Sequence, residues 1–248
     1  MAMAKETVAW WRGLLGIELS PVSHRERLIS ALGACIGMML VYAMTRAVFG
    51  PGHALVVAAP VGATAVLLFA IPHSAMSQPW PVVGGYAIST TVGVACAMLV
   101  PNELVAAGLA VGLSVAFMHY LHCLHPPGGA IALMAVIGGD PIRQMGFNFV
   151  VAPVLINVLI VVAAAIVFGA FFPWRRYPAI LGRAHTRVVP DENAYQAITH
   201  EDFVYALTQI DSFIDVSEED ILRIYALATQ RKPRTGTSGE QQSATRGG

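Results

Sequence analysis

Charge is scarce in this sequence. Charged residues make up 12% of the 248-residue chain, whereas a soluble globular domain has about 25%. Residues 28–174 contain only Arg46, Glu103, Asp140 and Arg143. Because 56% of all residues are hydrophobic, this shortage excludes an ordinary soluble domain. It predicts a membrane domain with polar ends.

Cysteines are few as well. Cys35, Cys96 and Cys123 all lie in apolar context, so they form no disulfide framework and we expect them to pack as small residues. The chain also lacks a phosphate-binding glycine loop, a nucleophile elbow and paired carboxylates within its apolar part, so we expect no enzymatic activity and no cofactor. Its basic residues form no patch with aromatics, which argues against nucleic-acid binding.

Six apolar segments follow one another, separated by Pro, Gly or Asn. They are residues 28–49, 53–71, 81–100, 104–122, 126–139 and 147–172. The fifth has fourteen residues, or about 21 Å of helix against about 30 Å of hydrocarbon. The predicted fold is an all-α polytopic membrane protein with six spans, or four spans plus two re-entrant half-helices. We expect Gly84, Gly85, Gly93 and Gly112 to be contact points between helices.

Basic residues flank the apolar region on both sides. They are Lys5, Arg12, Arg25 and Arg27 before it, and Arg175, Arg176, Arg183 and Arg187 after it. Positive flanks stay in the cytoplasm, so both ends should be cytoplasmic and the number of crossings even. We expect a bacterial inner (plasma) membrane protein.

Two stretches of the apolar region resemble each other. PVGATAVLLFAI (60–71) aligns without gaps on PPGGAIALMAVI (126–137), with four identities in twelve positions. The alignment suggests an internal duplication with halves at residues 28–100 and 103–172. Three crossings per half would invert the halves about an axis in the membrane plane, as in many transporters.

The regions outside the membrane domain, which we place at 28–174, differ in character. Residues 1–27 read as a cytoplasmic or interfacial segment. Residues 191–220 hold nine of the fifteen acidic residues, and residues 175–230 are predicted to form a small cytoplasmic helical pair. Residues 231–248 are predicted to be disordered. A homo-oligomer is expected, and a membrane sensor or scaffold acting through the acidic helices is an alternative function.

The two Pro-x-Gly stretches are the strongest candidates for a binding site. Proline favours the first turn of a helix, and a helix that begins inside a membrane presents unpaired N–H groups and a positive dipole end. Such an end suits a small anion, although it can equally be a helix break used only for packing. The candidate substrate-binding residues are Pro60, Gly62, Ala63, Thr64, His125, Pro126, Pro127, Gly128, Gly129 and Ala130.

The histidines of HYLHCLHPPGGA (119–130) allow a second interpretation. His119, His122 and Cys123 share a helical face if the helix continues, a spacing that permits metal ligation, but a membrane metal site would normally add carboxylates or thiolates. Packing or interfacial histidines are the alternative. His125 differs because it immediately precedes the predicted helix start, where it can bind an anion or carry a proton beside one.

These motifs resemble those of a known family. His125-Pro126-Pro127 followed by GGAIAL, the stretch at 62–85, and FFPWRRYP resemble the HPP family of integral membrane proteins. The resemblance implies four spans and a transporter. Plant and cyanobacterial relatives are associated with nitrite transport, so it also implies nitrite as substrate. Only the motif positions, residues 125–129, are carried over from it.

Overall fold

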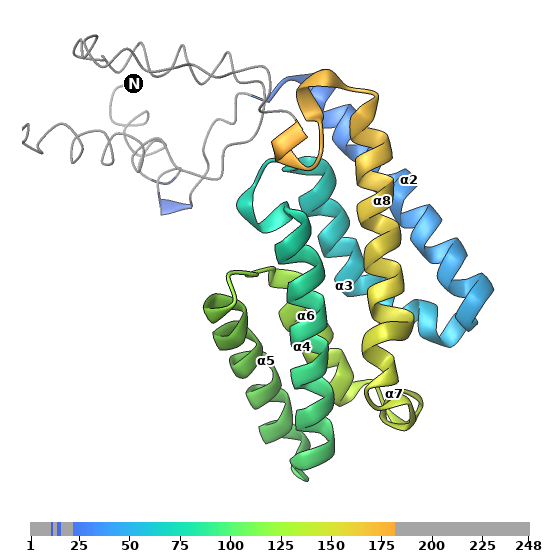
Figure 1. Cartoon of the computed structure of the whole chain (residues 1–248), viewed down its shortest axis with the longest axis vertical. Coiled ribbons are helices and arrows are strands. Elements are labelled where there is room, and N and C mark those ends of the chain that lie inside the picture. Colours follow the sequence, from blue (N-terminus) through green and yellow to red (C-terminus); the bar gives the residue numbers. More distant parts are fainter. Residues whose placement is uncertain (1–10, 12–13, 16–21, 182–248) are drawn as a thin grey trace, which may run out of the picture. The chain divides into compact units, whose positions relative to one another are not determined.

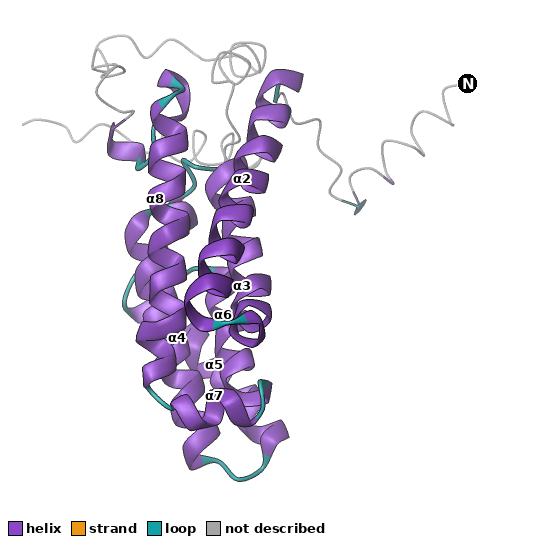
Figure 2. Ribbon diagram, turned by 90° about the vertical axis from the view of Figure 1, so that its right-hand side faces the viewer, coloured by secondary structure: helices purple, strands orange, loops and turns teal. Residues whose placement is uncertain are grey.

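The computed structural model describes residues 11, 14–15 and 22–181, without the side chains of residues 51–57. Every regular element in this part of the chain is helical (Figures 1 and 2). The α-helices are α2 (His24–Phe49), α3 (Pro51–Ala70), α4 (Pro79–Leu99), α5 (Glu103–Tyr120), α6 (Pro126–Ile137), α7 (Asp140–Met145) and α8 (Ile156–Ala170). Shorter turns are η1 (Ala75–Ser77), the π-helical η2 (Val150–Leu155), η3 (Pro173–Arg175) and η4 (Ala179–Leu181).

The predicted all-helical class is confirmed, and each of the six apolar segments contains a helix. Local signals explain the helix starts. The side chains of Ser23 and Asn102 cap α2 and α5 by accepting backbone N–H groups at 3.2 and 3.1 Å. Proline occupies the first turn of α3, α4, α6 and α7, where its missing N–H costs nothing. The sequence did not predict α7.

Four of the described helices are long and apolar enough to cross a membrane. They are His24–Phe49, Pro79–Leu99, Glu103–Tyr120 and Val150–Ala170. Two apolar helical stretches are shorter, Ala58–Ala70 and Pro126–Ile137. The number of crossings and the two-fold repeat therefore stay predictions.

Helix α4 packs closely against α6, and glycines make the approach possible. A Cβ atom added to Gly85 would lie 2.8 Å from the Cβ of His125, and one added to Gly93 would lie 2.5 Å from the carbonyl oxygen of Ala132. Since residue numbers rise together along both helices, α4 and α6 run parallel. The predicted contact role is confirmed for Gly85 and Gly93, whereas a Cβ atom added to Gly84 would meet Cys123 of the α5–α6 connection and Trp80 of its own helix.

The same prediction is wrong for Gly112. A Cβ atom added there would meet no other group within 4 Å. Gly112 lies on a face of α5 that is turned away from α4 and α6, and the same holds for Gly108 one turn earlier.

A buried ion pair joins the two flanks of the helical domain. The Arg175 guanidinium donates to Oε1 of Glu26 at 2.6 Å, to Oγ of Ser30 at 3.0 Å and to the carbonyl oxygen of Phe69. Trp174 donates its indole N–H to the other Glu26 oxygen at 3.0 Å. Burial lowers the pKa of Arg175, and the nearby Glu26 carboxylate opposes that shift. The start of α2 and the chain after α8 therefore lie at the same end of the bundle.

Several predictions fall outside the described residues. They are the interfacial character of most of residues 1–27, the acidic helical pair beyond residue 181, and the disorder of residues 231–248. Helix α2 starts at His24, before the predicted residue 28, because Ser23 provides the cap. The compartment that each end of the bundle faces stays a prediction.

Candidate functional site

The α5–α6 connection and the start of α6 lie within the bundle rather than beyond it. Trp80, in the first turn of α4, donates its indole N–H to the carbonyl oxygen of Leu121 at 3.1 Å. Figure 1 shows this connection crossing partway along α4. Helix α6 has 12 residues, which give about 18 Å of helix against about 30 Å of hydrocarbon. The predicted start of a short helix at Pro126 is confirmed, and its re-entrant character stays a prediction.

The prediction of a second short helix that starts at Pro60 is wrong. Helix α3 runs without interruption from Pro51 through Pro60 to Ala70, so no helix begins at Pro60. The helix begins earlier, at Pro51, directly after Gly50 with its φ of 82°. Pro60 can lie inside it because apolar membrane helices tolerate an internal proline. Gly62 and Ala63 therefore lie inside a helix. The predicted pair of facing helix N-termini does not exist in the described part of the chain.

His125 is the N-cap residue of α6 and is fully buried. Its Nδ1 lies 2.9 Å from the carbonyl oxygen of Met76, in η1. Because a carbonyl oxygen only accepts, Nδ1 carries the proton and donates it. In the neutral ring Nε2 is then an acceptor, and it lies 2.9 Å from Oγ1 of Thr64. Hydrogen-bond partners thus fix the tautomer of this histidine.

Thr64 extends the hydrogen bonds of His125 to α4. Its hydroxyl is 2.8 Å from the Tyr86 hydroxyl. The Thr64 hydroxyl also lies 3.4 Å from the Pro60 carbonyl oxygen of its own helix. When Thr64 instead donates to Nε2 of His125, which is the shorter contact, Tyr86 must donate to Thr64. The result is a directed chain, from Tyr86 through Thr64 to His125 and on to the carbonyl of Met76, and its three side chains are 0% exposed. We call these three residues and that carbonyl the polar chain. Thr64 was predicted as part of a second helix start at Pro60. The polar chain places it instead beside the start of α6.

Ser89 faces the first turn of α6. A Cβ atom added to Gly128 would lie 2.8 Å from Oγ of Ser89 and 3.1 Å from both the Gly85 carbonyl oxygen and Sδ of Met118. The Ser89 hydroxyl is fully buried and has no hydrogen-bond partner. Buried hydroxyls normally have one. An unpartnered donor thus points at the start of a helix.

The sequence interpretation missed Ser89 and Tyr86. Ser89 is four residues after Gly85, so both lie on one face of α4. Since Gly85 was predicted to touch another helix, the polar residue one turn later was the available signal. Tyr86 gave no comparable signal.

The predicted backbone N–H donors at the start of α6 are either missing or already bonded. Pro126 and Pro127 have no N–H, and the Gly128 N–H already donates to the carbonyl oxygen of His125 at 2.8 Å. Gly129 is half-buried and Ala130 is exposed. Both lie far enough into α6 for their N–H groups to donate to the carbonyl oxygens four residues earlier, on His125 and Pro126. The Ser89 hydroxyl is therefore the candidate donor that this geometry leaves.

The metal alternative gains no support from this geometry. Among the residues that the structure describes, no three His, Cys, Asp or Glu side chains lie close enough together to hold a metal ion. His119 and His122 are exposed, whereas Cys123 is buried. The helix ends at Tyr120, and His122 has a φ of 52°, so the helical face assumed for these residues does not form.

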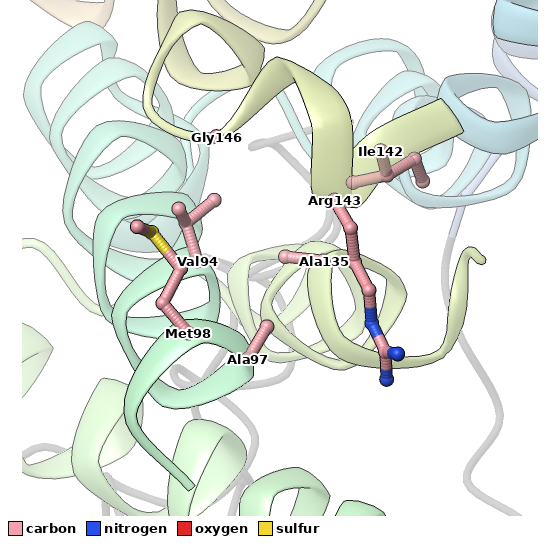
Figure 3. Close-up of a pocket in the computed structure, with 7 residues that line it drawn as sticks. All are labelled: Val94, Ala97, Met98, Ala135, Ile142, Arg143 and Gly146. Carbon is pink, nitrogen blue, oxygen red and sulfur yellow. The ribbon is translucent and has the colours of Figure 1, made fainter. Parts of the chain in front are cut away.

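A separate pocket of about 280 Å³ lies further along α4 and α6. Figure 3 shows walls from α4, α6 and α7. It is lined by Val94, Ala97, Met98, Ala135, Ile142, Arg143 and Gly146. Its one charged residue, Arg143, lies 3.6 Å from Glu103, and both side chains are exposed.

Comparison with known proteins gives a consistent result. The family model described as "HPP, transmembrane region" matches residues 19–178. A transmembrane protein of Dictyostelium discoideum is 40% identical over 120 residues, which cover 47% of this chain and 42% of that protein. A second is 32% identical over 177 residues, 69% of this chain and 57% of its own length. The chain thus spans about half the length of these relatives. No solved structure matches it.

Proposed function

This chain belongs to the HPP family of transmembrane proteins, and on that premise we propose that it moves a small monovalent anion across a membrane. Nitrite is the first candidate because of the family resemblance of the motif at residues 125–129. The binding site is the first turn of α6 together with Ser89. His125 and Thr64 hold this turn in place.

One observation carries the proposal. A buried helix N-terminus and a buried hydroxyl without a partner face each other at Gly128 and Ser89. A helix N-terminus acts as about half a positive charge, and an unpartnered hydroxyl is a donor that still lacks an acceptor. An anion at this position would satisfy both.

The charges of the helical domain support the same position. The acidic residues of its described part lie elsewhere: Glu26 pairs with Arg175, Glu103 lies near Arg143, and Asp140 begins α7. No hydrogen bond of the polar chain involves a carboxylate. An anion at the start of α6 would therefore meet little repulsion. Its affinity would be modest, as a transporter that must release its load requires.

The close packing of the site favours a small anion as substrate. Gly128 lies so close to Ser89, Gly85 and Met118 that even a methyl group would press against them. The described conformation is thus closed around this point. Transport requires α6 and α4 to separate slightly, and an anion of few atoms needs the least separation.

The remaining expectations extend the proposal. We place the protein in the bacterial plasma membrane with both flanks in the cytoplasm, acting as a homo-oligomer without enzymatic activity or nucleic-acid partner.

Reconstitution tests the function. The full chain in liposomes should take up nitrite faster than protein-free liposomes, with a rate that saturates as external nitrite rises. Gly128→Val should abolish the excess uptake, whereas Gly112→Ala, in open space on α5, should keep it. Uptake equal to that of protein-free liposomes over the whole nitrite range would rule out nitrite transport.

A further inference from the structure

We propose that each anion crosses together with one proton, which His125 takes up, so that the protein carries an electrically neutral load. This inference rests on the proposed anion transport and adds the coupling ion to it. Three observations carry it: the directed polar chain, the position of His125 at the start of α6, and the lack of a charged side chain among the described groups that contact that position.

The polar chain provides a path for the proton. Its three hydrogen bonds measure 2.8 Å between Tyr86 and Thr64, 2.9 Å between Thr64 and Nε2, and 2.9 Å between Nδ1 and the Met76 carbonyl oxygen. Hydroxyls and imidazole both donate and accept, so Tyr86, Thr64 and His125 can each receive one proton while passing on another, whereas the Met76 carbonyl only accepts a hydrogen bond. The chain is continuous across α4, α3 and α6.

The transfer balances. A proton that arrives at the Tyr86 hydroxyl displaces the phenolic proton to Thr64, and Thr64 passes its own proton to Nε2 of His125. Both hydroxyls end neutral, and the imidazole becomes imidazolium. Return of the Nε2 proton to Thr64, and of the Thr64 proton to Tyr86, restores the neutral ring and the starting state of both hydroxyls.

Electrostatics ties the proton to the anion. An imidazolium at the N-terminus of α6 faces the positive end of the helix dipole, which opposes it. A lone anion at the same place would be a buried charge without a full counter-charge, which is costly in a low dielectric. Bound together, the two charges neutralise each other. By linkage, each then raises the affinity for the other.

The neighbours of this position supply no permanent charge. The groups packed around His125 and the first turn of α6 are Thr64 from α3, Gly85, Tyr86 and Ser89 from α4, Met118 from α5, Cys123 from the connection, and the backbone of Met76 from η1. Besides His125, only Tyr86 and Cys123 among them can titrate, and the ordinary pKa values of both groups lie above 7. Among these described neighbours, a proton on His125 is therefore the positive charge that can come and go.

The decisive experiment measures nitrite and protons together. Proteoliposomes of the full chain carry a trapped pH indicator, nitrite uptake is followed separately, and a potassium gradient with an ionophore sets the membrane potential. Protein-free liposomes correct for leakage of nitrous acid. We expect about one proton per nitrite and an uptake rate that does not change when the potential is reversed.

Two other outcomes are distinguishable. Nitrite uptake without proton movement, with a rate that follows the membrane potential, would overturn the coupling and leave anion transport standing. No nitrite uptake above protein-free liposomes would overturn the proposed function, and the coupling with it.

Variants locate the proton carrier. His125→Gln keeps hydrogen-bonding atoms but cannot take up a proton, so proton movement should fall to background and any remaining nitrite uptake should follow the potential. His119→Gln makes the same replacement at an exposed position and should keep the ratio near one. A ratio of one in folded His125→Gln would overturn the assignment.

A second pair of variants covers the case in which His125→Gln does not fold. Thr64→Ser keeps the hydroxyl that links Tyr86 to His125, and should keep the proton-to-nitrite ratio. Thr64→Val removes it and should lower the ratio several-fold. Equal ratios in the two variants would overturn the path through Thr64.

Discussion

The hydroxyl of Thr64 lies 2.9 Å from Nε2 of His125, although 61 residues separate the two in sequence. This contact joins the middle of α3 to the start of α6. Through the other ring nitrogen, His125 also holds the carbonyl oxygen of Met76. One imidazole therefore connects a long helix, a half-helix and the turn that leads into α4.

Removing the Thr64 hydroxyl should destabilise the protein. Thr64→Val leaves both Nε2 of His125 and the Tyr86 hydroxyl without partners in a buried place, and one such loss costs about 1–3 kcal/mol. We expect the free energy of unfolding in detergent micelles to fall by about that amount. Thr91→Val is the matched control, because the Thr91 hydroxyl bonds only to the Ala87 carbonyl of its own helix and is exposed. Equal losses in the two variants would contradict the role of the polar chain.

Removing the Ser89 hydroxyl should separate stability from function. Ser89→Ala deletes a buried donor that has no partner, so the free energy of unfolding should stay the same or rise by about 1 kcal/mol. Nitrite affinity should fall, with KM rising about tenfold, as for the loss of one hydrogen bond to a charged group worth about 1.5 kcal/mol. Saturation curves in proteoliposomes and thermal unfolding of the same preparation measure both. An unchanged KM would remove Ser89 from the site.

A methyl group at Gly128 should collide with α4. In Gly128→Ala the new Cβ atom meets Oγ of Ser89 at 2.8 Å, and overpacking of this kind costs about 1–3 kcal/mol. The cost should shrink in a Ser89→Ala background, because the nearest colliding atom is gone. A double-mutant cycle of unfolding free energies measures this coupling. Additive effects would show that Gly128 and Ser89 do not touch.

Breaking the buried ion pair should be the most destabilising of these changes. Glu26→Gln leaves the Arg175 guanidinium, which is 3% exposed, without its counter-charge, and such a loss costs about 3–5 kcal/mol. We expect a large fall in the midpoint of thermal unfolding. Glu103→Gln removes an exposed partner 3.6 Å from Arg143 and should cost less than about 1 kcal/mol. Similar falls in both variants would contradict a special role for the pair at residues 26 and 175.

The sequence predicted the helices well because apolar length and proline punctuation are local signals. Glycine and proline mark most of the boundaries, and Pro126 was correctly recognised as the start of a half-helix. The prediction for Pro60 failed because two start signals compete in that stretch. Gly50 and Pro51 begin the helix first, and a similarity of four residues in twelve does not decide between them.

The site itself was only partly predictable. The motif identified His125 and Gly128, since both belong to the stretch that breaks the chain. Ser89 and Tyr86 reach the site through the packing of α4 against α6 and α3, which is a tertiary contact that periodicity does not contain. Both ring nitrogens of His125 have hydrogen-bond partners because Thr64 and Met76 lie beside them. These two residues are distant in sequence, and no local pattern predicts the contacts.

The shortness of α6 also bears on how the protein is made. A twelve-residue helix is well below the roughly 20 apolar residues that a membrane span requires. On its own it would therefore insert poorly into the bilayer. Its position in the bundle depends on packing against α4 at Gly85 and Gly93. Helix α4 precedes α6 in the chain and is therefore synthesised first. Helices α3 and α4 thus have to be in place before α6 can pack and the polar chain can form. A defect in α4 would then appear first as a protein that is degraded during biogenesis.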